Sequence, residues 1–370
     1  MTDQVLILGG RGRIGSSVAQ DLVAHTQVTI TVTGRQTTSE VTATQEVEPR
    51  IRFLALDLAD QEGLRKAIAS HNLVIHCAGP FLYRDTSVLK TCIEEGVNYL
   101  DVSDNRAFTR KALACRDAAA DKGVTAIINT GIFPGISNSM VRHDVEQLDE
   151  AELIHLSYVV SGSGGAGVTV MRTTFLGLQQ PFEVWSDNQW QLVKPYSQRE
   201  TIQFPAPYGK AGVYWFDMPE AFTLVESFPV KTVITKFGSV PDFYNHLTWM
   251  AAHLFPSPVL KNPAAIEFLA HVSHRMTSVS DRVSGIGVAI RSEVTGQKAG
   301  KSSRVCSTLV HDNTALAAGA GTGSLAELML AGKLKQPGVW PVEQALSTDL
   351  FEQTMQSRGI KIQCEATAIA

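Results

Sequence analysis

The sequence predicts an α/β protein with two domains. An N-terminal doubly wound Rossmann domain with a parallel sheet is followed by an α+β domain with a mixed or antiparallel sheet. Three observations carry this prediction. Short apolar strands alternate with single helices in the first third of the chain, as in parallel sheets with helical crossovers. A glycine-rich turn joins the first strand to the first helix. Later strands are joined directly by turns, which is typical of antiparallel pairs.

Six strands are expected in the first part of the chain. Each is a short apolar or β-branched run beside turn-forming residues. They are expected at residues 5–8, 28–33, 52–56, 73–76, 98–102 and 124–129. Helical spacing of apolar residues separates them at residues 14–24, 61–69, 85–95 and 105–120. Single helices between successive strands predict that these strands run parallel.

The remainder of the chain shows a different pattern of predicted strands and helices. Strands are expected at residues 151–161, 182–193 (a hairpin turning at 186–188), 230–236, 286–294 and 303–311. Residues 242–276 predict a helical hairpin with an aromatic face, which could be core, a dimer contact or a membrane contact. Helices are expected again at residues 315–332, 341–345 and 349–356. The expected domains are therefore 1–134, 135–312 and a helical C-terminal segment, 313–370.

Length and composition narrow the function classes. A chain of 370 residues exceeds what one hydrophobic core usually supports. The formal net charge of −4 argues against a nucleic-acid partner, because phosphate binding needs surplus Lys and Arg. No apolar run approaches the roughly 20 residues that span a bilayer. Five cysteines without a C-x-x-C pair suit reduced thiols, so we expect a cytoplasmic protein.

The glycine-rich turn is the strongest motif. It has the G-x-G-x-x-G pattern, directly after an apolar strand and at the start of an amphipathic helix, and this context indicates dinucleotide binding. The motif consists of Gly10, Arg11, Gly12, Arg13, Ile14 and Gly15. We expect Gly10 to allow the tight turn, Gly12 to admit the pyrophosphate and Gly15 to let the helix pack closely. The pyrophosphate would then lie at the positive end of the helix dipole.

The end of the second strand favours NADP(H) over NAD(H). An NAD site usually has an acidic residue there, which binds the ribose hydroxyls. This strand ends in Thr33-Gly34-Arg35 and has no acid. Arg35 can pair with a 2′-phosphate, and Arg13 could be a second partner. The alternative for Arg35 is a solvated loop arginine.

Two further turns are expected to line the cofactor. Asp57 follows the third strand and could reach the adenine edge, although a helix N-cap would look the same. Small residues follow the fourth strand and would let the chain pass flat against a cofactor. They are Cys77, Ala78, Gly79 and Pro80.

The chain resembles the saccharopine dehydrogenase family, in its NADP-dependent saccharopine reductase-like branch. Four stretches carry the resemblance, and they cover about the first 140 residues, roughly one Rossmann domain. They are residues 10–15, 76–81, 92–103 and 131–135. The resemblance implies an enzyme that uses NADPH to reduce an imine formed from an amine and a carbonyl, or that runs the reverse. It also implies that the C-terminal helices pack back on the Rossmann domain and that the middle domain covers the substrate and dimerises.

Catalytic candidates are expected where the parallel strands end, because ligands of open α/β sheets bind there. The polar residues at these positions are Tyr83, Asp101, Ser103, Asp104 and Asn129. Asp101 and Asp104 could hold an amine or act as acid and base, and Tyr83 is a third catalytic candidate. Alternatively, one carboxylate caps the next helix and the other binds backbone amides. Ser103 is expected to contact the cofactor.

Weaker candidates lie in the second half of the chain. The alternating glycines of residues 319–324 could bind a carboxylate through free N–H groups, or could serve close helix packing. Arg172 could clamp a substrate carboxylate, or be a solvated helix residue. His271 and His274 form a short helical pair without a third ligand nearby, so no metal site is expected.

The leading hypothesis is an NADP-dependent oxidoreductase that acts on an imine, secondary amine or carbonyl of a small molecule. Two alternatives stay open at this point. One is a non-catalytic NADPH-binding regulatory protein. The other is a reductase of a lipid or isoprenoid-like substrate at a membrane surface, suggested by the apolar stretch 242–276.

Overall fold

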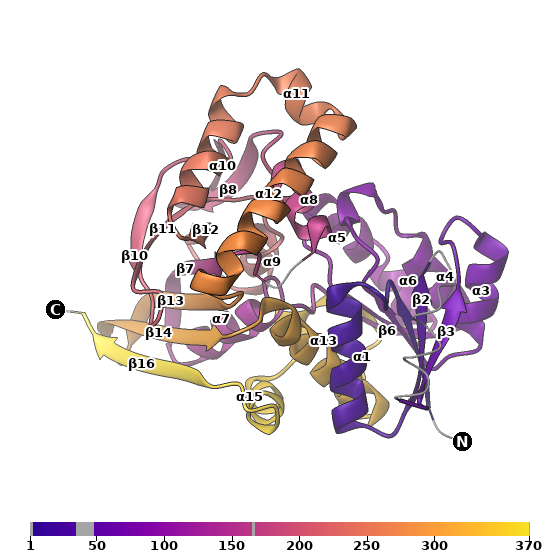
Figure 1. Ribbon diagram of the computed structural model, residues 1–370. Coiled ribbons are helices and arrows are strands. Elements are labelled where there is room, and N and C mark those ends of the chain that lie inside the picture. Colours follow the sequence, from indigo (N-terminus) through magenta and orange to yellow (C-terminus); the bar gives the residue numbers. More distant parts are fainter. Residues whose placement is uncertain (1–2, 35–47, 165–166, 370) are drawn as a thin grey trace. The chain divides into compact units, whose positions relative to one another are not determined.

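The protein is described here from a computed structural model, which covers residues 3–34, 48–164 and 167–369. The chain forms two compact units (Figure 1). The first unit contains Met1–Ile136 and Ala315–Ser347. The second unit contains Ser137–Thr314 and Thr348–Ala370. Residues 348–370 thus lie with the second unit, whereas the sequence analysis grouped them with residues 313–347.

The first unit is built on a parallel sheet. In the described part of the chain this sheet has seven strands, in the order β15-β6-β5-β4-β1-β2-β3, and each neighbouring pair is parallel. The strands are β1 (Gln4–Leu8), β2 (Thr29–Gly34), β3 (Ile51–Ala55), β4 (Leu73–His76), β5 (Asn98–Asp101), β6 (Thr125–Ile128) and β15 (Gly338–Pro341). The first six agree with the predicted strands. The short Gly-Val-Trp-Pro run of β15 was not predicted.

Helices cover both faces of this sheet. They are α1 (Arg13–His25), α3 (Gln61–Ala69), α4 (Ser87–Glu95), α5 (Arg106–Leu113), α6 (Arg116–Asp121), α13 (Thr314–Leu330) and α14 (Val342–Ala345), with the 3-10 helix η1 (Phe81–Tyr83). One hydrophobic core joins alternate residues of the strands, such as Leu6 and Tyr99, to α3, α4, α5 and α6. On the other side, α1 lies against β1 and β2. The doubly wound fold is therefore confirmed.

The predicted helix over residues 105–120 is interrupted and forms α5 and α6. The first residue of α6, Arg116, contacts the strand β15. Arg116 donates a hydrogen bond from Nε to the carbonyl of Val339 at 2.9 Å, and its guanidinium lies 4.3 Å from the ring centre of Trp340. Both partners belong to β15, so α6 is held against the strand that extends the sheet.

The strand order reverses between β1 and β4. The chain begins at β1, adds β2 and β3 on one side, and then returns to place β4, β5 and β6 on the other. Ligands of open parallel sheets bind beyond the carboxyl ends of the strands at such a reversal. This position in the first unit lies directly beyond Leu8 and His76, which pair in the sheet.

The second unit contains a mixed sheet. Within the described residues, the order is β10-β11-β12-β7-β13-β14-β16, and β8 joins β12 to β9. Strands β12 and β7 are parallel, and the other pairs are antiparallel. The strands are β7 (Glu150–Ser161), β8 (Phe182–Ser186), β9 (Gln189–Val193), β10 (Glu200–Gln203), β11 (Lys210–Trp215), β12 (Thr232–Val240), β13 (Val288–Lys298), β14 (Lys301–His311) and β16 (Ile362–Ala368). The sequence analysis did not predict β10, β11 or β16.

Two hairpins of this sheet turn on residues with positive φ. Asp187 and Asn188 have φ of 51° and 60°, and Ala299 and Gly300 have φ of 52° and 72°. Two successive residues of this kind match the twist of the flanking strands. The turn at residues 186–188 was predicted. The turn between β13 and β14 is shorter than predicted, because β13 ends at Lys298 and β14 begins at Lys301.

The helices of the second unit include the predicted helical hairpin. They are α7 (Ile136–Glu146), α8 (Val168–Leu176), α9 (Glu220–Ser227), α10 (Phe243–Leu254), α11 (Ser257–Lys261), α12 (Pro263–Ser284) and α15 (Thr348–Ser357). Helices α10, α11 and α12 form the hairpin at the top of Figure 1. Across the described residues, none of the helices combines the length and the apolar character that crossing a membrane requires.

Candidate functional site

Close backbone contacts explain the glycines of the loop between β1 and α1. A Cβ atom on Gly10 would lie 2.6 Å from Cβ of Val32, and one on Gly15 would lie 2.5 Å from the carbonyl oxygen of Gly9. The absence of a side chain at Gly15 thus lets the first turn of α1 lie against the backbone of Gly9 and Gly10. The tight turn belongs instead to Gly9, whose φ is +75°. The sequence analysis missed Gly9, although the Gly9-Gly10 pair was its signal.

Gly12 leaves the N-terminus of α1 open. It is the N-cap residue, no side chain caps the helix, and the first turn contains no acid. Among the residues that the structure describes, only the Gly9 carbonyl oxygen lies within 4 Å of a Cβ built on Gly12, at 3.2 Å. The N–H groups of Arg13, Ile14 and Gly15 belong to this first turn. The positive end of α1 can therefore accept an anion such as a pyrophosphate.

The turn after β4 lies opposite this loop. A Cβ on Gly9 would be 2.8 Å from Cα of Ala78, so the two turns touch where the strand order reverses. Cys77 donates its backbone N–H to Leu8, and Gly79 and Pro80 complete the turn. Burial raises the pKa of the Cys77 thiol to about 12. Cys77 is therefore a neutral thiol that lines the turn.

Arg11 of the glycine loop lies beside the end of β2. Cδ of Arg11 lies 2.9 Å from the position of a Cβ on Gly34, and its guanidinium lies 5.5 Å from the ring centre of Phe53. Arg35 lies outside the described residues, so its predicted contact with a 2′-phosphate stays a prediction. Arg11 brings a positive charge to the strand end where that phosphate was predicted.

Asp57 lies just beyond β3 and is exposed. Its Oδ1 accepts a hydrogen bond from the backbone N–H of Ala59 at 3.0 Å. The N-cap of α3 is Asp60, which accepts from Gly63 N–H. The alternative that Asp57 is a helix cap is thus excluded, and its predicted contact with adenine stays a prediction.

Asp101 ends β5 in a fully buried position. Its Oδ1 accepts hydrogen bonds from the backbone N–H groups of Ser103 and Asn129, both at 3.0 Å. Asn129 also donates from Nδ2 to the Ser103 carbonyl at 2.8 Å. Burial raises the pKa of Asp101 to about 6, against the effect of these two donors. Asp101 therefore ties the turn after β5 to the end of β6.

Asp104 lies on the same turn but is only half-buried. Removal from water raises the pKa of its carboxyl to about 6. The cap of the following helix is Asn105, which accepts from Phe108 N–H, so Asp104 is not the cap. Tyr83, at the end of η1, is 56% exposed. The predicted polar residues thus lie at one edge of the sheet with different access to solvent.

His76 is buried at the end of β4 and belongs to the core. Its ring lies 5.0 Å from that of Phe81 and 6.5 Å from those of Tyr99 and Phe108, measured between centroids. Burial is the main cause that lowers the pKa of His76 to about 3. The imidazole is therefore neutral at physiological pH.

The glycines of residues 319–324 serve helix packing, and the hypothesis of a carboxylate site there is wrong. They lie inside α13, where the helix uses its own N–H groups. A Cβ on Gly319 would be 2.7 Å from the backbone of Ser17, and one on Gly321 would be 2.5 Å from the carbonyl oxygen of Gly131. These contacts bring α13 against α1 and against the loop after β6.

Arg172 and His271 converge on one glutamate. Arg172 of α8 donates from Nε and one terminal nitrogen to Glu267 of α12, both at 2.7 Å. Nε2 of His271 lies 2.9 Å from the same carboxylate. The suggestion that Arg172 clamps a substrate is therefore replaced by a bidentate ion pair between two helices.

Comparison with known proteins agrees with this geometry. Residues 5–127 match the family described as the saccharopine dehydrogenase NADP binding domain. The first unit contains such a domain. The chain is an oxidoreductase that carries this NADP-binding domain, and its cofactor is NADP(H).

Relatives extend the likeness beyond the cofactor domain. The chain is 25% identical to the carboxynorspermidine synthase of Vibrio cholerae over 334 residues, which are 81% of this chain and 80% of that protein. It is 25% identical to the carboxyaminopropylagmatine dehydrogenase of Synechocystis over 267 residues, 67% of this chain and 65% of that protein. The fold matches apo saccharopine dehydrogenase (L-Glu forming) from Saccharomyces cerevisiae with a TM-score of 0.72 at 15% identity, over 99% and 100% of the two chains.

Proposed function

We propose that this saccharopine dehydrogenase-like protein transfers a hydride between NADP(H) and the carbon of a C=N or C–N bond in a small molecule. The observation that carries the proposal is the open N-terminus of α1 at Gly12, beside the reversal of strand order. A nicotinamide dinucleotide bound there would have its pyrophosphate on the helix dipole. Its reactive ring would then lie along the edge that carries Asp104 and Tyr83.

The names of two relatives suggest the substrate class. Carboxynorspermidine and carboxyaminopropylagmatine are both amines that carry a carboxyl group. We infer that this protein acts on a carboxylated alkylamine, formed when a primary amine and a carbonyl compound are joined reductively. In that direction the nitrogen of the C=N bond takes up a proton while its carbon receives the hydride.

Asp104 is the group that we propose for this proton transfer. Its carboxyl is half-buried and its pKa is raised to about 6, so it holds a proton more readily than an ordinary aspartate near neutral pH. The exposed Tyr83 is suited to contact the substrate. Asp101 is fully buried, and we assign it the positioning of the turn that carries Ser103 and Asp104.

Preference for NADP(H) is assigned to two arginines. Arg11 lies beside Gly34 at the end of β2, and Arg35 is the next residue along the chain. A planar guanidinium pairs well with a phosphate dianion and gains little from a ribose hydroxyl.

The testing experiment is a fluorescence titration of the purified protein with NADPH and NADH, followed by assays with pairs of amines and oxoacids. We expect tight NADPH binding, weaker NADH binding and NADPH oxidation with one pair. Gly12→Val is the control, because its side chain fills the approach to α1 and should abolish binding of both cofactors. Normal NADPH affinity in Gly12→Val would overturn the site.

The same titration separates the remaining alternatives. NADPH binding without turnover on any pair would favour a regulatory NADPH-binding protein over an enzyme. Turnover of a lipid or isoprenoid-like substrate only in the presence of liposomes would favour the membrane-surface reductase. The exposed apolar side chains of α10 and α12 are the observation that the membrane-surface alternative would use, and we assign them to a dimer contact instead.

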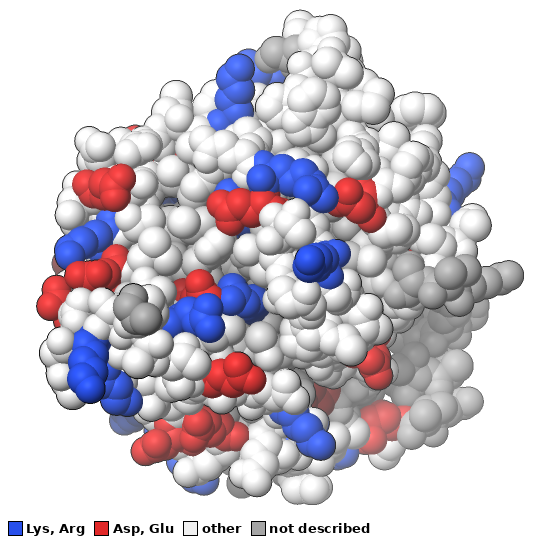
Figure 2. Space-filling model, turned by 90° about the vertical axis from the view of Figure 1, so that its left-hand side faces the viewer, with Lys and Arg blue, Asp and Glu red and all other residues white. Residues whose placement is uncertain are grey.

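We further propose a homodimer formed through α10, α11 and α12. Large apolar side chains on these helices are exposed, notably Phe243 (56%), Leu254 (61%), Phe268 (67%) and Val279 (78%). Figure 2 shows that the top of the molecule is largely uncharged, whereas acidic and basic side chains are interspersed below. A contiguous apolar face on a folded unit usually marks an interaction surface.

The proposed location is the cytoplasm, and no nucleic-acid partner is proposed. All five cysteines are free thiols, as expected in a reducing compartment. On the face that Figure 2 shows, acidic and basic side chains are interspersed, and the formal net charge of the chain is −4. Nucleic-acid binding usually needs a surplus of Lys and Arg gathered in one patch.

A further inference from the structure

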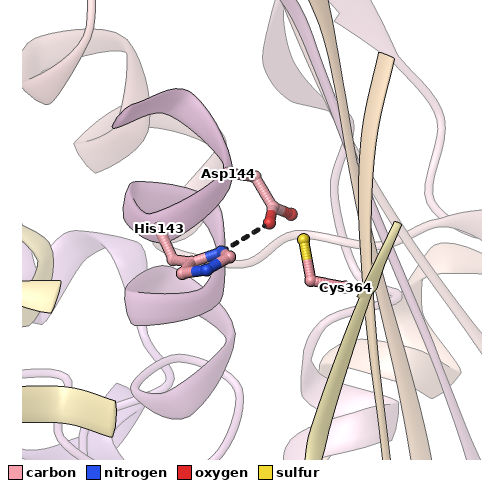
Figure 3. Close-up of side chains that lie close together, drawn as sticks. All are labelled: His143, Asp144 and Cys364. Carbon is pink, nitrogen blue, oxygen red and sulfur yellow. Dashed lines mark hydrogen bonds and ion pairs between the residues drawn. The ribbon is translucent and has the colours of Figure 1, made fainter. Parts of the chain in front are cut away.

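A cluster of potential metal ligands lies in the second unit, which lacks the cofactor loop. His143 and Asp144 are on α7, and Cys364 is on the edge strand β16 (Figure 3). One nitrogen, one oxygen and one sulfur atom of these side chains all lie within 4.8 Å of one another. Among the described residues, this is the one group of three or more His, Cys, Asp or Glu side chains whose ligand atoms lie that close together.

The register of the sheet explains how residues so far apart in sequence meet. Ser292 of β13 pairs with Ser307 of β14, and Ser307 pairs with Cys364 of β16. Paired residues point to the same face of a sheet. The Ser307 hydroxyl donates a hydrogen bond to Oδ1 of Asp144, so this row of side chains faces α7.

Asp144 has an oxygen without a partner in this cluster. The residue is fully buried, and its Oδ1 accepts from Ser307 and from Nδ1 of His143, the latter at 2.9 Å. Its Oδ2 accepts no hydrogen bond from any described residue. Figure 3 shows the carboxyl group close to the Cys364 thiol. A buried carboxylate oxygen without a partner is costly, and a bound cation would satisfy it.

The orientation of His143 suits a metal ligand. Its Nδ1 faces Asp144, and its Nε2 lies 3.4 Å from Oε1 of Glu352 on α15. A histidine that binds a metal through one nitrogen usually donates the other N–H to a carboxylate or carbonyl. Glu352 occupies that outer position, and a cation would replace the proton between Nδ1 and Asp144.

The charges around the cluster favour a cation. Besides the buried Asp144, the carboxylate of Glu352 lies 3.4 Å from Nε2 of His143, and Glu365 follows Cys364 on β16. Glu146, on the same helix as His143, is paired with Arg142 at 2.7 Å. The surroundings are therefore negative on balance, as a site for a divalent cation requires.

We propose that His143, Asp144 and Cys364 bind one divalent transition-metal ion, with zinc favoured. Thiolate, imidazole and carboxylate together suit zinc, whereas magnesium and calcium prefer oxygen ligands alone. Donor atoms on one tetrahedral zinc ion lie about 3.5 Å apart, so movements on the order of 1 Å close the site. Water completes the fourth position.

The ion has a structural role. Strand β16 is exposed along nearly its whole length and is held to the sheet through its pairing with β14. A metal bound by Cys364 and by two residues of α7 joins this edge strand to the helix. Metal binding and folding of this part of the chain are then linked.

The test uses the full-length protein, freed of metal with EDTA and kept reduced with a phosphine. Zinc chloride is titrated in competition with a chromophoric chelator, and cobalt(II) chloride is added in parallel because a cobalt–thiolate bond absorbs in the near ultraviolet. We expect one equivalent of zinc, a thiolate band with cobalt and a rise in Tm with zinc. Cys364→Ser should abolish the band and weaken zinc binding at least 10-fold, as should Asp144→Asn.

Cys306→Ser is the matched control. Cys306 precedes Ser307 on β14, so its side chain points to the other face of the sheet, and its loss should leave zinc affinity unchanged. Far-ultraviolet circular dichroism and NADPH affinity check that each variant is folded. Absence of saturable zinc and cobalt binding, or wild-type affinity in folded Cys364→Ser, would overturn the site. Binding without a rise in Tm would overturn its structural role.

Discussion

Asp101 and Asp104 lie three positions apart at the end of β5, and their surroundings separate their roles. Asp101 is fully buried and its carboxyl accepts two backbone hydrogen bonds, whereas the residue Asp104 is only half-buried. In both cases burial raises the pKa to about 6. Burial is thus the common cause, and access to a ligand is the difference. Because of this difference, we assign the positioning of the turn to Asp101 and the proton transfer to Asp104.

Asp104→Asn should lower turnover about 10²- to 10⁴-fold, the usual contribution of a general acid or base, with NADPH affinity unchanged. The protonated carboxyl is the donor in the reductive direction. The pKa of about 6 therefore predicts that kcat/KM falls as pH rises through that value. Steady-state assays across pH 5–8 measure this. Asp187→Asn, in the exposed turn between β8 and β9, is the control. An unchanged rate in Asp104→Asn would contradict its role in proton transfer.

Asp101→Asn should change how stability depends on pH. The folded-state pKa of about 6 lies above the ordinary value of 3.8, so the carboxyl favours folding below pH 4 and this contribution is lost as pH rises to 6. The difference between these two pKa values corresponds to about 3 kcal/mol of unfolding free energy. Urea unfolding measures the free energy of unfolding of both proteins between pH 4 and 7. Over this range the value for Asp101→Asn, relative to the wild type, should rise by that amount. Parallel pH curves for the two proteins would contradict the burial argument.

Arg11→Ala should weaken NADPH binding by about 1–3 kcal/mol, the scale of a charge-assisted contact, and leave NADH binding nearly unchanged. Arg35→Ala should behave in the same way. The reason is that both arginines are assigned to the 2′-phosphate, which NADH lacks. Titration with both cofactors measures the difference, and equal losses for NADPH and NADH would show that neither residue distinguishes them.

At the scale of elements, α13 determines how α1 is held. Its alternating glycines let the helix approach Ser17 and Asp21 of α1, as well as Gly131. Helix α1 carries the anion-binding N-terminus, so its placement depends on a helix about 300 residues later in the chain. The sequence shows the alternating glycines but leaves open whether they form a ligand site or a helix contact. Only the residues that pack against them decide between these two interpretations.

Gly321→Val should destabilise the protein by about 1–3 kcal/mol or more, because added methyl groups would displace the backbone at Gly131. Chemical denaturation measures the loss, with NADPH as a second readout of the first unit. Leu316→Ala, an exposed position on the same helix, should change stability by less than about 0.5 kcal/mol. A wild-type midpoint for Gly321→Val would contradict the close contact.

At the scale of the whole molecule, each unit has its own sheet and its own buried residues. The chain enters the second unit after Ile136, returns to the first at Ala315 and leaves it again after Ser347. Strands β15 and β16 therefore end up in different sheets although they are close in sequence. Such an arrangement makes the C-terminal part of the chain necessary for both units.

The full-length protein should sediment as a dimer at micromolar concentration. The exposed apolar side chains of α10, α11 and α12 provide the surface, and burying them releases water from apolar area. Phe268→Glu should shift the protein to a monomer, since a carboxylate there opposes burial. Leu192→Glu, on the exposed strand β9, is the control. A monomeric wild type would leave the helical face to another partner.

The sequence by itself determined the Rossmann unit and its cofactor loop. Both depend on the order of neighbouring segments along the chain, namely strand β1 (Gln4–Leu8), the glycines and helix α1. They also depend on the alternation of apolar and polar residues within each segment. The tertiary structure decided what depends on distant residues. It placed β15 and β16, enclosed Asp101 but not Asp104, paired Arg172 with Glu267, and brought Cys364 to His143 and Asp144. Burial and contacts between distant segments arise from packing, which no local pattern in the chain specifies.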